Sequence, residues 1–137
     1  MEDIYMKKFL AIAVSLLFSF GIAFAADTDS APAQDSLTRT IVPENQHVEN
    51  KTASVRLEYT PLTDEVIAYY KVLAVSYDPG EAMNAILECL NDFKMQNQYD
   101  SYKHLHKYNV KYFKDENGLR WAEHREWVKF NSSRLAY

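Results

Sequence analysis

Residues 60–93 read TPLTDEVIAYYKVLAVSYDPGEAMNAILECLNDF and decide the predicted fold. Apolar side chains recur every three or four residues in both halves of this stretch, which is the period of an amphipathic helix. In the first half they are Leu62, Val66, Tyr70, Leu73 and Tyr77, and in the second they are Met83, Ile86, Leu87, Leu90 and Phe93. The turn-forming residues Asp78-Pro79-Gly80 separate the two halves. The sequence therefore predicts an antiparallel pair of helices.

The first predicted helix is apolar on more than one side. Pro61 suits the first helical position. Ala68, Val72 and Val75 lie away from the main apolar stripe. A helix that is apolar on both sides is usually buried on both sides. We therefore expect either the C-terminal segment or a second subunit to cover it, and the second option would make the protein a homodimer.

Strands are predicted on both sides of the helical pair. Residues 54–59 alternate, so that Val55, Leu57 and Tyr59 fall on one face of a short strand. Asn117-Gly118 is the preferred centre of a tight hairpin turn. Residues 125–130 either extend the second strand of that hairpin or form a last helix. The predicted fold class is α+β, with the helical pair packed on a small antiparallel sheet or hairpin; a mainly α fold is the alternative.

The start of the chain has the three parts of a secretory signal peptide. Residues 6–26 read MKKFLAIAVSLLFSFGIAFAA: two lysines, an apolar run and a small-x-small end. We predict a signal peptide over residues 1–25, with cleavage after Ala25. A true start at Met6 would remove Glu2 and Asp3 and leave a purely positive n-region. An uncleaved membrane anchor is the alternative, because the apolar run approaches the length of a membrane span.

The export signal predicts a periplasmic or secreted protein, and its two-lysine start and short apolar core are typical of bacteria. Residues 26–53 are rich in small polar residues and show no apolar period, so they are predicted to be a flexible tether. Residues 54–137 are predicted to form a single globular domain. Cys89 is the single cysteine, which excludes an internal disulfide. Its thiol is interpreted either as a small buried apolar side chain or as a functional group.

Charge is distributed unevenly along a chain whose net charge is −4. Residues 26–98 hold 12 acidic and five basic side chains, whereas residues 99–137 hold five acidic and eight basic ones. A basic second half could steer a polyanionic partner to this end of the chain. The simpler interpretation is that the two halves complement each other.

Catalytic motifs are sparse. After residue 25 the glycines are Gly80 and Gly118, and two isolated glycines cannot build a phosphate-binding loop or a nucleophile elbow. Glu123, His124 and Glu126 form an acid–base cluster within four residues, and they are the candidate catalytic residues of a small cell-envelope enzyme. A charged, exposed face is the competing interpretation of the same cluster.

His104 and His106 are the candidate metal ligands. On a strand, residues two apart point to the same side and could share a metal, whereas on a helix they diverge by about 200°. His124, with Glu123 or Glu126, could supply a third ligand if the fold brings these residues together. Because the surrounding pattern favours helical or irregular structure, we predict no metal and no cofactor.

Aromatic and basic residues are interleaved in the last part of the chain, and this is the main indication of a binding surface. The predicted binding residues are Tyr112, Arg120, Trp121, Arg125 and Trp127. Tryptophan and arginine dominate the energetics of protein interfaces. We therefore predict a small exported binding or accessory protein, such as an inhibitor or immunity-type factor, that acts on another exported protein or an envelope component. Nucleic acid is not expected as a partner. The competing interpretation is that the rings fill the core.

Overall fold

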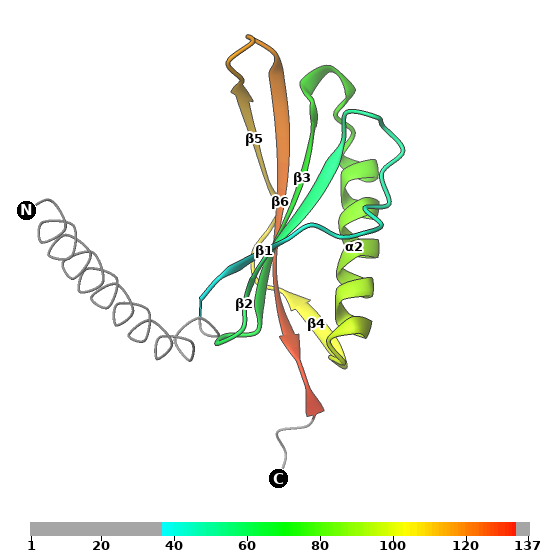
Figure 1. Ribbon diagram of the computed structural model, residues 1–137, viewed down its shortest axis with the longest axis vertical. Coiled ribbons are helices and arrows are strands. Elements are labelled where there is room, and N and C mark those ends of the chain that lie inside the picture. Colours follow the sequence, from blue (N-terminus) through cyan, green and yellow to red (C-terminus); the bar gives the residue numbers. More distant parts are fainter. Residues whose placement is uncertain (1–36, 134–137) are drawn as a thin grey trace, which may run out of the picture. The chain divides into compact units, whose positions relative to one another are not determined.

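Residues 37–133 are described by the computed structural model, and they form one antiparallel six-stranded sheet with one long helix against it (Figure 1). The strands are β1 (Arg39–Ile41), β2 (Ser54–Thr60), β3 (Glu65–Leu73), β4 (Ser101–His104), β5 (Asn109–Lys114) and β6 (Arg120–Asn131). The helix is α2 (Pro79–Gln96), preceded by the short 3-10 helix η2 (Ala74–Ser76). The predicted helical pair on a small sheet is therefore wrong, and so is the mainly α alternative.

The predicted signal peptide over residues 1–25, the start at Met6 and residues 26–36 of the predicted tether lie outside the described residues. Residues 37–53, the rest of that tether, contain β1 and a segment that packs on α2. No helix within residues 37–133 has the length and apolar character needed to cross a membrane.

The first predicted helix is replaced by a turn over residues 61–64 and by strand β3. Val66, Ala68, Tyr70 and Val72 are fully buried, and they alternate along the strand. The residues between them include Ile67 and Tyr69, which are also apolar or aromatic, so a spacing of two and a spacing of three or four both fit this stretch. Its β-branched and aromatic content favours the strand.

The second predicted helix is present as α2. Asp78 is its N-cap, because the Asp78 side chain accepts a hydrogen bond of 2.8 Å from the backbone N–H of Glu81, and Pro79 occupies the first helical position. Asp78-Pro79-Gly80 therefore starts one helix instead of separating two. The helix buries Ala82, Ala85, Ile86, Cys89, Leu90 and Phe93 against the sheet.

The strand order in the sheet is β1-β2-β3-β6-β4, and β5 lies on the same edge of β6 as β4. Residues 105–108 interrupt that edge, where the backbone N–H of Leu105 still donates to the carbonyl of Trp127. The predicted hairpin around Asn117-Gly118 joins β5 to β6, with Gly118 at φ 78°. Residues 125–130, left open between strand and helix by the sequence, belong to β6.

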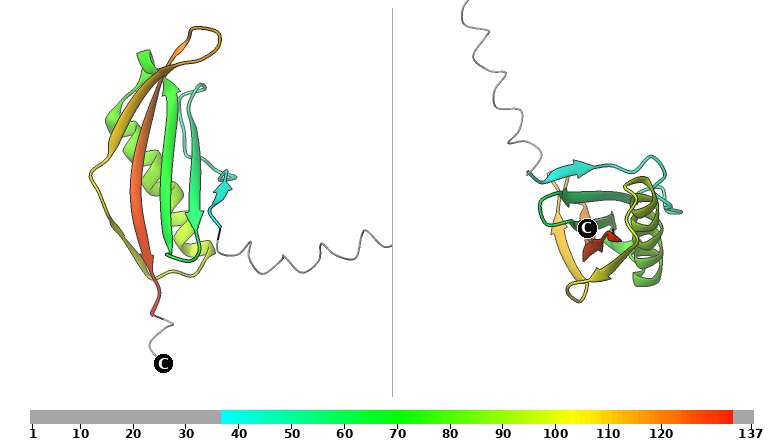
Figure 2. Two further views of the ribbon diagram at one scale, coloured as in Figure 1. Left: turned by 90° about the vertical axis from the view of Figure 1, so that its left-hand side faces the viewer. Right: turned by 90° about the horizontal axis from the view of Figure 1, so that it is seen from below.

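The core lies between α2 and one face of the sheet, whereas the other face has no helix over it within residues 37–133 (Figure 2). Aromatic rings close one end of this core: the ring centroids of Tyr99 and Phe130 are 4.9 Å apart, and those of Tyr59 and Phe93 are 5.0 Å apart. The Tyr99 hydroxyl also donates to the carboxylate of Asp64, which holds the turn before β3 in place.

Leu90→Ala is expected to lower the free energy of unfolding by about 2–5 kcal/mol, because Leu90 is fully buried between α2 and the sheet. Leu62→Ala is the matched control, since Leu62 lies in the turn before β3 and is 76% exposed. Urea denaturation of both variants measures the difference. Equal midpoints for the two would show that α2 does not pack on the sheet as described.

Candidate functional site

The predicted acid–base cluster is divided between the two faces of the sheet. Successive residues of a strand point to opposite faces. His124 and Glu126 therefore lie on the face that packs on α2, together with Tyr70 and Ala68 opposite them on β3. Glu123 lies on the other face. The structure brings His124 and Glu126 together but separates Glu123 from both.

His124 is fully buried in a hydrogen-bonded network. Its Nδ1 lies 2.9 Å from the Tyr77 hydroxyl and its Nε2 lies 3.1 Å from Glu126 Oε1. The Tyr108 ring stacks on the imidazole at 4.7 Å. Burial and the nearby Tyr108 and Tyr112 raise the pKa of Tyr77 to about 12, so its hydroxyl keeps its proton and can donate it to His124. His124 can then donate its other ring N–H to Glu126, which leaves each buried polar group with a partner.

His104 and His106 do not form a shared metal site. His104 Nδ1 lies 3.2 Å from Glu126 Oε2, whereas the His106 ring contacts the edge of Trp127 at a centroid distance of 6.0 Å. Trp127 and Glu126 are consecutive residues of β6 and point to opposite faces. Within residues 37–133 no group of three or more His, Cys, Asp or Glu side chains is arranged to hold a metal.

The face without a helix over it, called the open face below, is organised around Tyr69. Arg56 on β2, Tyr69 on β3 and Arg125 on β6 are aligned in register across the sheet. The Arg56 guanidinium lies 3.9 Å from the centre of the Tyr69 ring, and that of Arg125 lies 5.3 Å from it. The Tyr69 hydroxyl donates to Glu58 at 2.7 Å. Tyr69 is 7% exposed although no helix within residues 37–133 covers it, because the two arginines lie over its ring.

Glu123 joins the two arginines. Its Oε2 accepts from Arg56 Nη1 at 3.0 Å, and its Oε1 accepts from Arg125 Nη2 at 2.7 Å and Nε at 3.0 Å. Burial alone would raise the pKa of Glu123, but the hydrogen bonds and charges of the two guanidinium groups outweigh it and lower the pKa below its ordinary value. Glu123, proposed from sequence as a catalytic acid or base, therefore positions two arginines.

A second aromatic cluster lies beside this one. Lys71 Nζ is 4.5 Å from the centre of the Trp121 ring and 5.5 Å from that of Phe113. The indole N–H of Trp121 donates to Asp115 at 2.8 Å, and this bond is the main reason why the pKa of Asp115 is lowered. Trp127 lies further along β6, opposite Ile67. Both tryptophans are half-buried.

Three of the five predicted binding residues, Trp121, Arg125 and Trp127, lie on the open face. The other two, Tyr112 and Arg120, lie on the opposite side of the β5–β6 hairpin, where the Arg120 guanidinium is 5.0 Å from the Tyr112 ring. Sequence reasoning missed Arg56, Tyr69 and Lys71. If residues 65–73 had been interpreted as a strand, the alternation of side chains along β2 and β3 would have placed these residues on the face opposite the core.

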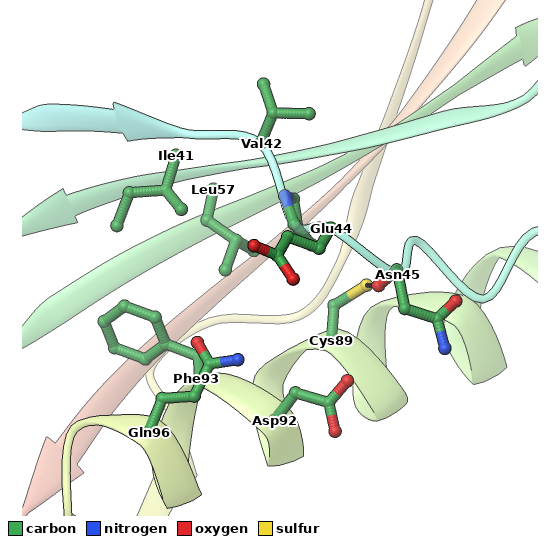
Figure 3. A pocket seen from close by; sticks show the side chains of 10 residues that line it. Ile41, Val42, Glu44, Asn45, Leu57, Cys89, Asp92, Phe93 and Gln96 are labelled. Carbon is green, nitrogen blue, oxygen red and sulfur yellow. Dashed lines mark hydrogen bonds between the residues drawn. The ribbon is translucent and has the colours of Figure 1, made fainter.

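A cavity of about 460 Å³ lies on the α2 side of the sheet (Figure 3). The residues that line it lie within residues 41–57 and 89–96, far from His124 in the sequence. The cavity opens beneath the strap, which we define as residues 42–53, between β1 and β2. The strap is held on α2 by His47, whose Nε2 lies 2.7 Å from Asp92 Oδ2, and by the Cys89 thiol, which lies 3.5 Å from the carbonyl oxygen of Gln46. His124 lines neither this cavity nor a second one beside the N-terminus of α2.

Comparison with known proteins gives no match, since no family model, no curated protein and no solved structure is similar to this chain. The assignment of function therefore starts from the open face and the cavity themselves.

Glu123→Gln is expected to lower the free energy of unfolding at pH 7 by about 1–3 kcal/mol, because it removes the charge that both arginines bind. The folded-state pKa of Glu123 lies below the unfolded value, so this stabilisation is present above the unfolded pKa, 4.5 in an unperturbed chain, and is lost as the pH falls through the folded pKa. Urea denaturation at pH 7 and about pH 3 should therefore show a smaller acid-induced loss in Glu123→Gln than in the wild type.

Glu116→Gln is the control for that experiment, because Glu116 lies exposed in the β5–β6 turn. It should leave the stability at both pH values almost unchanged. An identical acid-induced loss in all three proteins would contradict the role assigned to Glu123.

Proposed function

We propose that this protein is an exported binding or accessory protein, such as an inhibitor or immunity-type factor, whose open face binds an acidic surface of another exported protein. The export signal at residues 6–26 supports the location. The observation that carries the binding role is a sheet face without a covering helix on which aromatic rings and basic side chains are interleaved.

The aromatic content of the open face supports a protein partner. Trp121, Trp127 and Phe113 are half-buried on the sheet, so part of each ring faces away from it. Rings of this size, placed beside arginines, are the side chains on which interface energy concentrates. A partner that covers them would remove apolar surface from water, at about 25 cal/mol for each Å².

The charge of the open face indicates an acidic partner. The register places six basic and three acidic side chains on this face: Arg56, Lys71, Lys103, Lys111, Arg125 and Lys129 against Glu58, Glu65 and Glu123. This excess of positive charge belongs to a chain whose net charge is −4. Opposite potentials steer two proteins together and exclude wrong partners.

Lys103 and Lys129 place two neighbouring positive charges on the open face. They lie directly opposite each other on β4 and β6, where like charges are destabilising, and Glu65 on β3 lies opposite Lys129 on its other side and offsets part of this repulsion. Neither makes an ion pair within residues 37–133. A carboxylate of a bound protein would relieve this repulsion.

The centre of the open face is preorganised. Glu123 holds the guanidinium groups of Arg56 and Arg125 over the Tyr69 ring before any partner arrives. Side chains that are already ordered lose less conformational entropy on binding. Two arginines ordered in this way therefore suit specific recognition better than two independently mobile arginines would.

The partner is identified by crosslinking the protein in an envelope extract, followed by mass spectrometry. The extract is probed in parallel with the wild type and with a Lys103→Glu, Lys129→Glu double variant. A protein that is captured by the wild type and lost with the double variant supports the proposal. Equal capture by both would contradict the role of the open face.

Trp127→Ala is expected to weaken binding of that partner by about 2 kcal/mol, or roughly 30-fold, because a half-buried tryptophan next to Arg125 on the same face is a typical hot spot. Tyr112→Ala is the matched control, since Tyr112 is an exposed aromatic residue on the opposite side of the β5–β6 hairpin. Affinity and melting temperature are measured for both variants. A parallel loss of stability and binding in Trp127→Ala would assign this ring to the core, and equal weakening by Tyr112→Ala would refute the choice of face.

A further inference from the structure

The cavity under the strap is a second feature that calls for a ligand, and it shares no residue with the open face. Its floor reaches the core, because Leu57, Cys89 and Phe93 line it and are almost completely buried. Ile41 adds a further apolar wall where β1 ends. Its volume, about 460 Å³, lies within the range of small-molecule sites.

All the charged side chains that line this cavity are acidic. Glu44 and Asp92 line it, as do Asn45 and Gln96, whereas no lysine, arginine or histidine does. Figure 3 shows the Glu44 carboxylate extending from the strap into the space between the sheet and α2. Glu44 makes no ion pair within residues 37–133. Asp92 is anchored through one oxygen by His47.

We propose that this cavity binds an alkylammonium group, with the aliphatic chain beside the partly exposed Ile41, above the buried Leu57 and Phe93, and the ammonium at the carboxylates of Glu44 and Asp92. An apolar floor and an acidic rim match the two parts of such a group. The same match would disfavour a carboxylate or phosphate ligand, whose charge the rim repels.

The state of Cys89 agrees with this assignment. Burial raises the pKa of its thiol to about 11, and the negative charges of Asp92 and Glu88 add to the shift. The floor of the cavity therefore carries a neutral, weakly polar thiol at pH 7. Burial is the main cause of this shift, and the smaller contribution from Asp92 and Glu88 has the sign that attracts a cation.

The alkylammonium group could belong to a free amine or to a lysine side chain of a bound peptide. The two sources are tested as separate arms of one NMR titration of the purified protein, with n-pentylamine, which is an ammonium ion at pH 7, and with a lysine peptide blocked at both ends. Pentanol and pentanoate are the neutral and anionic controls of equal chain length.

The expected result is saturable shifts of the backbone amides of residues 41–45 and 89–96 with n-pentylamine, with an affinity at least about threefold higher than for pentanol and no binding of pentanoate. Glu44→Gln should weaken binding of n-pentylamine about two- to fivefold, because an exposed carboxylate contributes at most about 1 kcal/mol to an ion pair. Among the described residues Glu44 has no ion-pair partner to lose, so the variant should fold normally, and Glu116→Gln should bind like the wild type.

Tighter binding of the lysine peptide than of n-pentylamine would identify a protein side chain as the occupant, and the reverse would identify a small amine. Equal affinity for n-pentylamine and pentanol, or shifts confined to residues outside the cavity, would overturn the proposal. Unchanged n-pentylamine affinity in Glu44→Gln would overturn it as well. None of these outcomes depends on the open face, and Trp127→Ala should leave the titration unchanged.

Discussion

The pairing of β3 with β6 is the constraint on which the rest of the structure depends. Nine residues of β3, from Glu65 to Leu73, are in register with nine residues of β6. Both strands also have a strand on their other edge, so neither can slip by one residue without moving every buried side chain to the wrong face. Val66, Val72 and Val128 are fully buried at this pairing, and α2 packs over them. The same register aligns Tyr69 with Arg125 on the open face, so core packing and the candidate site are set by one interaction.

The alternation of β6 explains why neighbouring residues have unrelated roles. His124 and Glu126 face α2, where the Tyr77 hydroxyl can donate to His124 and the ring N–H of His104 can donate to Glu126. Glu123 faces the other way and orders two arginines. A cluster that looks like catalytic machinery along the sequence is thus divided by geometry into a core network and a support for a surface. Because side chains alternate along a strand, His124 and Glu126 are buried against α2, whereas Glu123 supports the arginines of the open face.

The sequence predicted some of these features and not others for identifiable reasons. Helix α2 was predictable because its polar face is distinct and its period is unambiguous. Residues 65–73 were not, because β3 is apolar on both faces, and a segment of that kind fits a helix and a central strand equally well by spacing alone. That one error also hid Tyr69 and Lys71, and with them the alignment with Arg56 and Arg125. Trp121 and Trp127 could be selected from residue type, but which face they share depends on the pairing of distant strands, which no local pattern contains.

Net charge conceals how the charges of this fold are arranged. The strap and α2 carry Glu44, Glu49, Glu81, Glu88 and Asp92 against Lys51 and Lys94, whereas the open face has an excess of basic side chains. Within residues 37–133 the sheet separates these two groups of charges, which differ in sign although the net charge of the chain is only −4. This arrangement agrees with an acidic partner at the open face and a cation in the cavity beneath the strap, as proposed above. Because the two proposed sites select opposite charges and share no residue, occupation of one does not block the other directly, and any coupling between them must pass through the β2–β3–β6 sheet that supports both.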